Sequence, residues 1–197
     1  MKKNIYMLAG LMSILALSSC IKQIDKTFQG QTVVEIDPTV LNSANATAGY
    51  PVLTRIPAEG IPLRTADSTL RRLNGIIRVR LNLVGPQLDQ AQTIGYKILT
   101  ASPITSVSFP ATATGQSPSA AAATLTVTNA VAGTHYTALS GSCTIAPKSS
   151  YGYIEIPIIN GGATAGQARF LGIQLDSSGT LKPNPNYNKI GLAIDQR

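Results

Sequence analysis

The sequence is poor in the side chains that most enzyme and metal sites require. It has no tryptophan, a single histidine (His135) and two cysteines (Cys20 and Cys143). Because no Cys/His cluster has the spacing of zinc ligands, we expect neither a metal nor a cofactor. No serine lies in a complete Gly-x-Ser-x-Gly elbow, and the nine acidic residues form no catalytic motif. We therefore expect that the chain is not an enzyme.

Charged residues are also sparse, at 13% of the chain, whereas 44% of the residues are apolar. This balance is typical of a folded chain and not of a disordered one. The formal net charge is +7, but the basic residues are scattered, so the surplus does not predict a nucleic-acid partner. After Leu17 no apolar run approaches the roughly 20 residues that a membrane-spanning helix needs.

The first twenty residues run from positive to apolar to small. Lys2 and Lys3 precede an apolar run from Ile5 to Leu17, which is typical of a secretory signal peptide. The segment Leu17–Cys20 (Leu-Ser-Ser-Cys) resembles the bacterial lipobox. The resemblance implies cleavage before Cys20 and lipidation of its thiol. We expect residues 1–19 to be a lipoprotein signal peptide and residues 20–31 to be a lipidated tether.

Lipidation at Cys20 would determine where the protein works. Each buried acyl CH₂ group contributes about 0.8 kcal/mol, so two or three acyl chains attach a protein to a membrane almost permanently. The lipobox resemblance thus implies a lipoprotein of the cell envelope, and we expect it to be an outer-membrane lipoprotein. An acidic run just after the lipidated cysteine often marks export to the cell surface, but here only Asp25 is acidic. The sequence therefore does not decide between the cell surface and the periplasmic face.

Alternation of apolar and polar residues dominates the rest of the chain. In the segment 77–83, apolar residues at odd positions alternate with Arg78, Arg80 and Asn82, a period of two that is typical of a half-buried strand. Similar patterns predict strands near residues 34–37, 94–98, 106–109, 124–128, 144–145, 151–159, 170–175 and 190–194. With Gly, Pro and Asn turns between them, these segments predict an all-β, antiparallel sandwich of about seven to nine strands.

We expect residues 32–197 to form a single β-sandwich domain. Residues 38–69 are rich in Pro, Ala, Asn and Thr, which favours extended and turn conformations, with a short helical turn around Thr39–Ala44. The Ala/Thr/Ser/Gly/Pro tract at 111–123 predicts a long loop.

Four segments resemble known families. Gly133–Tyr136, Thr144–Pro147 and Gly152–Ile158 resemble parts of Calx-β-like and related immunoglobulin-type modules, which implies an immunoglobulin-like β-sandwich. His135 stands where those modules commonly carry an acidic residue, so their calcium binding is not expected here. Thr27–Asp37 resembles the opening of uncharacterised Bacteroidetes lipoproteins, members of domain-of-unknown-function families encoded beside Sus-type uptake systems.

Two pairs of outward-facing side chains are candidates for a ligand or partner surface. Tyr151 and Tyr153 lie two residues apart on one strand, and their rings could form a small platform for a sugar. Arg78 and Arg80 could meet an acidic partner or an acidic glycan. The alternatives are cross-strand packing of the tyrosines under a loop or second sheet, and a solvated or edge strand protected by charge.

Two further residues are candidates for chemical change. Asp67-Ser68-Thr69 resembles the short motif at which Bacteroidetes attach O-glycans, which implies O-glycosylation of Ser68; the alternative is an ordinary Asp-Ser turn. Cys143 is the only cysteine left once Cys20 is lipidated, and we expect it to be a small buried hydrophobic residue.

These features predict a lipid-anchored cell-envelope accessory protein, a non-catalytic binding or interaction module associated with nutrient or glycan uptake. Its expected partners are the membrane, through Cys20, and an outer-membrane uptake complex or a polysaccharide. The alternative is a structural or spacer lipoprotein that packs against an outer-membrane complex. A pilin-like subunit that exchanges a strand at an open sheet edge is a further variant.

Overall fold

The computed structural model describes residues 30–99 and 101–197. The expected signal peptide, Cys20 and nearly all of the expected tether lie outside these residues. Within the described ranges, no helix has both the length and the apolar character needed to cross a membrane. The described elements are twelve strands and one 3₁₀ helix: β1 (Val33–Ile36), η1 (Pro38–Ser43), β2 (Ala44–Asn45), β3 (Tyr50–Leu53), β4 (Ile76–Val84), β5 (Gln92–Leu99), β6 (Ser106–Phe109), β7 (Ala123–Asn129), β8 (Ser142–Ile145), β9 (Tyr151–Pro157), β10 (Gln167–Leu175), β11 (Lys182–Pro183) and β12 (Lys189–Asp195).

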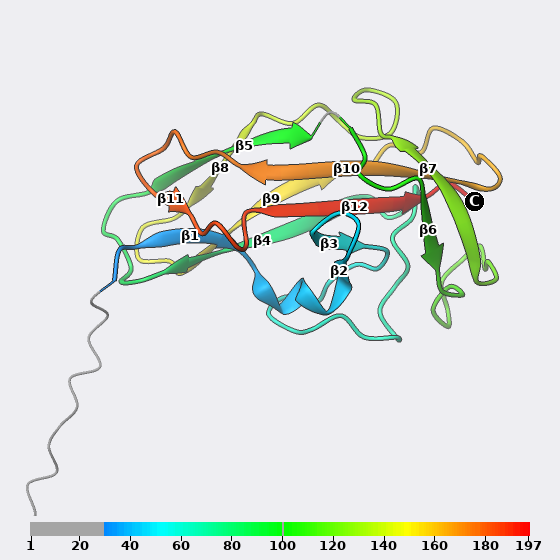
Figure 1. Cartoon of the computed structure of the whole chain (residues 1–197), viewed down its shortest axis with the longest axis horizontal. Helices are drawn as coiled ribbons and strands as arrows, with labels where there is room; N and C mark the ends of the chain where they lie inside the picture. The colour runs from blue at the N-terminus through cyan, green and yellow to red at the C-terminus, as the bar shows by residue number, and fades with distance from the viewer. Residues whose placement is uncertain (1–29, 100) are drawn as a thin grey trace, which may run out of the picture.

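The strands follow one hydrogen-bonded path, in the order β11-β1-β4-β9-β8-β5-β10-β12-β3-β2. β5 connects the two halves of this path, because its first part pairs with β8 and its second part pairs with β10. β6 and β7 form a hairpin that joins the edge of β10. The body is elongated, with β1 toward one end and the C-terminus at the other, beside β7 (Figure 1).

The two halves of the path share one apolar core, which makes the molecule a β-sandwich. Alternate residues of β4 and β9 point inward, and they meet alternate residues of β10 and β12. Buried members from both halves include Ile77, Val79, Leu81, Ile154, Ile156, Leu171, Ile173 and Leu192. The predicted all-β fold is confirmed, since the period of two places one apolar row of each strand in this core.

Two details of the expected fold are wrong. The sheet is mixed and not purely antiparallel, because β1 pairs with β11, β7 with β10 and β3 with β12 in parallel. The described strands number twelve, not seven to nine. The unexpected strands are β2, β3 and β11, which have only two to four residues and so show no clear alternation. Parallel pairing depends on long crossover connections, which alternation within a strand does not reveal.

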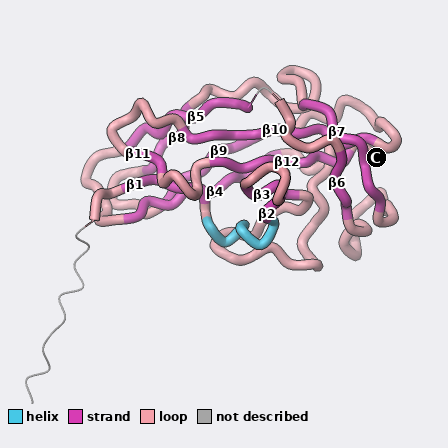
Figure 2. Tube along the Cα trace, viewed as in Figure 1, coloured by secondary structure: helices cyan, strands magenta, loops and turns pink. Residues whose placement is uncertain are grey.

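The short helix η1 follows directly from local sequence. Asp37 precedes it, and the Asp37 carboxylate accepts a hydrogen bond from the Thr39 N–H at 3.0 Å. Pro38 occupies the first turn, where its missing N–H and restricted φ cause no loss. The helix therefore begins one residue before the expected turn. It lies on one side of the strands, near β2 and β3 (Figure 2).

The connection between β6 and β7 is tied to the segment around Thr69. The side-chain amide of Gln116 accepts from the Thr69 N–H at 3.0 Å and donates to the Thr69 carbonyl at 2.8 Å, as a neighbouring strand would. The guanidinium of Arg71, which is buried, donates to the carbonyl of Pro118 in the same connection. Low-complexity composition thus coexists here with specific tertiary contacts.

Candidate functional site

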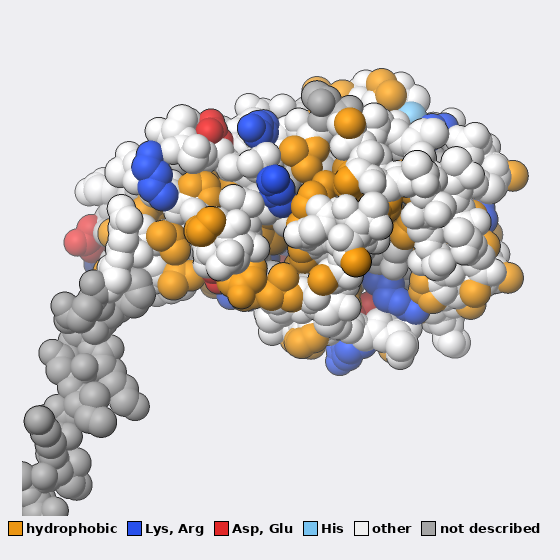
Figure 3. Space-filling view, viewed as in Figure 1, with side chains coloured by type: hydrophobic (Ala, Val, Ile, Leu, Met, Phe, Trp, Pro, Cys, Tyr) orange, Lys and Arg blue, Asp and Glu red, His pale blue; other side chains and the backbone are white. Residues whose placement is uncertain are grey.

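Exposed large hydrophobic side chains indicate that β4 and β9 carry a candidate site. Figure 3 shows the face on which β10 and β12 lie in front of β4 and β9, and few charged side chains separate the hydrophobic ones there. Two of the large hydrophobic residues that are exposed lie on these neighbouring strands, Ile76 on β4 at 58% and Tyr151 on β9 at 44%.

The pairing of β4 with β9 brings all four predicted surface residues together. The strands are antiparallel, and each inward-pointing residue of β4 lies opposite an inward-pointing residue of β9. The outward-pointing residues are therefore paired as well, with Arg78 opposite Glu155, Arg80 opposite Tyr153 and Asn82 opposite Tyr151. We call Arg78, Arg80, Tyr151 and Tyr153 the tyrosine–arginine face.

The four side chains of this face contact one another. The rings of Tyr151 and Tyr153 meet edge to face, with centroids 5.7 Å apart. The Arg80 guanidinium carbon lies 4.6 Å from the centroid of Tyr151, and that of Arg78 lies 5.6 Å from the centroid of Tyr153. Each cation–π contact contributes about 0.5–1 kcal/mol at an exposed site, and it also restrains the two side chains. The result is a preformed polar and aromatic surface.

Carboxylates balance the two arginines. Arg78 Nη2 lies 2.9 Å from Glu155 Oε1 in an ion pair that is about half exposed on both sides. Arg80 Nε lies 4.0 Å from Asp37 Oδ2 and donates to Asn82 Oδ1 at 2.9 Å. Because each positive charge has a neighbouring carboxylate, the face is not a strongly cationic patch. This arrangement favours a neutral ligand over the acidic partner considered from the arginines alone.

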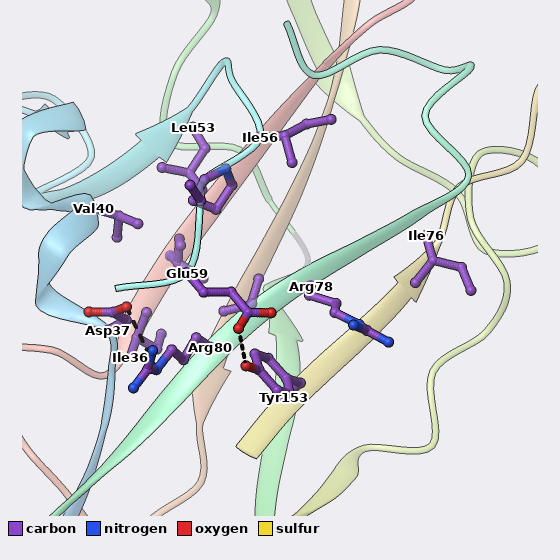
Figure 4. A pocket seen from close by; sticks show the side chains of 14 residues that line it. Ile36, Asp37, Val40, Leu53, Ile56, Glu59, Ile76, Arg78, Arg80 and Tyr153 are labelled. Carbon is purple, nitrogen blue, oxygen red and sulfur yellow. Dashed lines mark hydrogen bonds and ion pairs between the residues drawn. The ribbon is translucent and has the colours of Figure 1, made fainter. Parts of the chain in front are cut away.

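The loop that follows β3 reaches the face. The Tyr153 hydroxyl donates to Glu59 Oε2 at 2.6 Å, a contact between residues 94 positions apart (Figure 4). The Gly60 N–H donates to the Asp37 carboxylate at 3.2 Å and holds the same loop. The hydrogen bond to Glu59, with smaller contributions from desolvation and the Glu59 charge, raises the pKa of Tyr153 to about 12.

This contact gives a titration that can be measured. The neutral phenol is the donor, so the hydrogen bond is complete below the ordinary tyrosine pKa of 10 and is lost as the pH rises toward 12. Glu59→Gln is expected to lower the pKa of Tyr153 toward 10, because a neutral amide no longer opposes ionisation. NMR of ¹³Cζ-labelled tyrosine would follow the ring directly. Glu155→Gln, which leaves Glu59 intact, serves as the control; equal titration in wild type and Glu59→Gln would contradict the assignment.

A small apolar cavity lies between this loop and β4. Its volume is about 180 Å³. The interior is lined mainly by aliphatic side chains, and Asp37, Glu59, Arg78, Arg80 and Tyr153 border it (Figure 4). The aliphatic lining residues are Ile36, Val40, Leu53, Ile56, Pro57, Ala58, Ile76, Val79 and Ile190.

A wider, shallow groove lies on the opposite side of the tyrosines. It has a volume of about 650 Å³ and follows β8 and β9, which share only the bridge between Ile145 and Gly152 before they separate. Tyr151 and Tyr153 contribute to this groove too. Its hydroxyl-bearing lining comes from Thr137, Ser140, Ser142, Thr144 and Ser149. The tyrosines thus stand between an apolar cavity and a polar groove.

The remaining predicted residues lie elsewhere. Ser68 is exposed and lies in an irregular segment. Its main-chain carbonyl accepts a hydrogen bond from the Ile56 N–H at 2.8 Å. Cys143 packs against the main core, as expected of a small hydrophobic residue, but it is only half-buried. Desolvation raises the pKa of its thiol to about 11. In the described part of the chain, no three His, Cys, Asp or Glu residues gather into a metal-ligand cluster.

Asp37 and Glu59 are parts of this site that sequence reasoning missed. Both come from irregular segments, and each reaches β4 or β9 only through the fold. Asp37 did carry a local signal as a helix cap before Pro38. Glu59 carried none, because a single exposed glutamate in a Pro-rich loop has many alternative surroundings.

Comparison with known proteins gives structural likenesses only. The chain matches no protein-family model and no curated protein sequence. Among solved structures it is similar to the apo-form Calx CBD1 domain, with a TM-score of 0.45 and 13% identity over 85% of this chain and 100% of that one. It is also similar to CBD12 from CALX1.2, with a TM-score of 0.41 and 14% identity over 64% of this chain and 41% of that one. Likeness at this level says nothing about what the chain binds.

Proposed function

We propose that this chain is a non-catalytic glycan-binding module of the cell envelope, and that the tyrosine–arginine face is its binding surface. The observation that carries the proposal is the preformed contact of Tyr151 and Tyr153 with each other and with Arg80 and Arg78. Aromatic rings offer a sugar a flat apolar surface with little loss of conformational entropy. The neighbouring guanidinium and carboxylate groups offer donors and acceptors for hydroxyl groups.

The balance of charge and the adjoining groove indicate the kind of glycan. Because Arg78 and Arg80 are each paired with a carboxylate, they attract an acidic sugar only weakly, and a neutral polysaccharide is the better fit. The groove along β8 and β9 has room for sugar units beyond those on the tyrosines. Its serine and threonine hydroxyls suit polar ligands better than apolar ones.

The cellular part of the proposal rests on the N-terminal sequence. Lipidation of Cys20 would place the module on the outer membrane, as an accessory to nutrient or glycan uptake in the manner of Bacteroidetes lipoproteins. We include two further points in the same proposal. The sandwich is Calx-β-like and immunoglobulin-like, and the exposed Ser68 is O-glycosylated. Intact-mass analysis of the membrane fraction tests the anchor, since retention of residues 1–19 would contradict it.

Glycan binding is tested with the full chain in detergent, by affinity electrophoresis on a panel of neutral polysaccharides. Wild type is expected to be retarded by at least one of them. Tyr151→Ala with Tyr153→Ala should weaken that binding by about five- to thirtyfold, because about 1–2 kcal/mol of ring contact is lost. Tyr187→Ala removes a tyrosine outside the face and should change little.

The same experiment distinguishes glycan binding from the alternative function, that of a structural lipoprotein. No retardation on any neutral polysaccharide, or equal retardation of the double variant, would contradict glycan binding at this face. Co-purification with an outer-membrane complex, independent of added saccharide, would instead favour a structural lipoprotein.

A further inference from the structure

One edge of β4 is only partly used. On the other edge, β9 pairs with β4 from Ile76 to Asn82, which includes the stretch before Arg80. On this edge β1 pairs only with residues Leu81–Val84, and the last bond runs from the Asp37 N–H to the Arg80 carbonyl at 3.0 Å. The chain then turns into η1 at Pro38. The stretch of β4 before Arg80 therefore has an open edge.

The main chain of Arg78 faces this open edge. The Leu83 N–H donates to Ser150 at 2.8 Å and the Ile158 N–H donates to Gly75 at 2.7 Å, so odd-numbered residues of β4 carry the bonds to the β9 side. In an antiparallel pair, the main-chain groups of the alternate residues point to the opposite edge. No hydrogen bond among the described residues engages the Arg78 N–H or carbonyl on that edge.

The apolar cavity lies beside the same edge. At about 180 Å³ it is enclosed by buried aliphatic residues of β1, β3, β4 and β12 and covered by the loop from Ile56 to Glu59. A comparable apolar cavity of about 150 Å³ in an engineered protein holds benzene. The space thus suits one leucine-sized or phenyl-sized group.

We infer that this edge and cavity form a docking slot for an extended peptide from a partner protein. The peptide adds a short strand parallel to β4 beside Arg78 and inserts one leucine-sized side chain into the cavity. In a parallel pair, the residue whose N–H donates to the Arg78 carbonyl has its side chain on the face opposite to that of Arg78, which is the inner face. In strand addition, main-chain hydrogen bonds supply affinity and a side-chain pocket supplies specificity. Asp37 and Glu59 offset Arg78 and Arg80 at the mouth, so neutral residues flank the inserted side chain.

This inference can be tested separately from glycan binding, although Arg78, Arg80 and Tyr153 border both sites. Peptide docking uses the main chain of Arg78 and the interior behind β4, whereas glycan binding also requires the outward-facing ring of Tyr151. Tyr151 does not line the cavity, so Tyr151→Ala is expected to leave peptide binding unchanged while it weakens glycan binding.

The test measures fluorescence anisotropy of a labelled, end-capped peptide, Thr-Thr-Leu-Thr-Thr, added to the full chain in detergent. Replacement of the leucine by alanine is expected to weaken binding by at least about tenfold, since most of the apolar surface buried in the cavity is lost. N-methylation of the leucine amide, which removes the donor to the Arg78 carbonyl, is expected to weaken binding by about tenfold.

Variants of the protein locate the binding. Ala58→Leu fills the cavity from the covering loop and should weaken binding of the leucine peptide by at least about tenfold. Ala66→Leu makes the same change at an exposed position outside the cavity and should have no effect. Absence of binding would overturn the inference. Equal binding of the N-methylated peptide would also overturn it, because the cavity would then accept any small apolar group without strand addition.

Discussion

Replacement of Arg197 by alanine is expected to lower the free energy of unfolding by about 3 kcal/mol, because it leaves a buried carboxylate without its counter-ion. The Asp195 side chain is fully buried. Arg197 Nε donates to both carboxylate oxygens at 3.0 and 3.1 Å, and Nη2 donates to Oδ2 at 2.8 Å. Arg197 Nη1 also donates to the Ala121 carbonyl at 2.8 Å, which ties the β6–β7 connection to β12.

Urea unfolding of the full chain would measure this loss, and two further variants identify its cause. Arg64→Ala removes an exposed arginine that lies 3.6 Å from Asp67, and such a pair contributes at most about 1 kcal/mol. Adding Asp195→Asn to Arg197→Ala should recover part of the lost stability, because the stranded charge is gone. Equal losses in Arg197→Ala and Arg64→Ala would show that burial of the carboxylate has little effect.

Replacement of Gly191 by alanine is expected to cost about 2–3 kcal/mol through overpacking. Gly191 on β12 lies directly opposite Gly172 on β10, and the ring of Phe170 covers both glycines. A Cβ at Gly191 would lie 2.5 Å from Cε2 of Phe170. Phe170 is 2% exposed and belongs to a smaller apolar cluster that also includes Val52, Phe109 and Leu125, so the ring has little freedom to move away.

The same unfolding measurement distinguishes this clash from a general glycine effect. At Gly179 the nearest atom to a new Cβ lies 3.8 Å away, so Gly179→Ala should change the free energy of unfolding by less than about 0.5 kcal/mol. Phe170→Leu should make Gly191→Ala less harmful than it is in the wild-type background, since the two residues touch. If the losses of unfolding free energy in Gly191→Ala and Phe170→Leu simply add in the double variant, the Phe170 ring does not cause the destabilisation by Gly191→Ala.

Local sequence predicted which side chains of the site point outward. The alternation through residues 77–83 and 151–159 separated Arg78, Arg80, Tyr151 and Tyr153 from the apolar rows beside them, and the structure has the same division. The register did not follow from this pattern. Arg80 lies opposite Tyr153 because β4 and β9 pair across a separation of about 70 residues, and alternation is equally compatible with other partners and offsets.

The long-range parts of the site had no comparable signal. Glu59 reaches Tyr153 only because the Pro-rich loop returns over β4, and the cavity exists only because β1 leaves β4 at Asp37. Both features depend on where connections run after the strands have paired. The parallel pairs of β7 with β10 and β3 with β12 were unpredictable for the same reason.

The sequence by itself determined the all-β character, the apolar row of each long strand and the side chains left to face solvent. These follow from a period of two, which is a local property of an extended chain with one face buried. Tertiary structure alone decided the mixed order of twelve strands, the contact of two tyrosines with two arginines, and the open edge beside an apolar cavity. Strand partners are chosen by how the whole chain buries its apolar rows together, so no single segment contains that information.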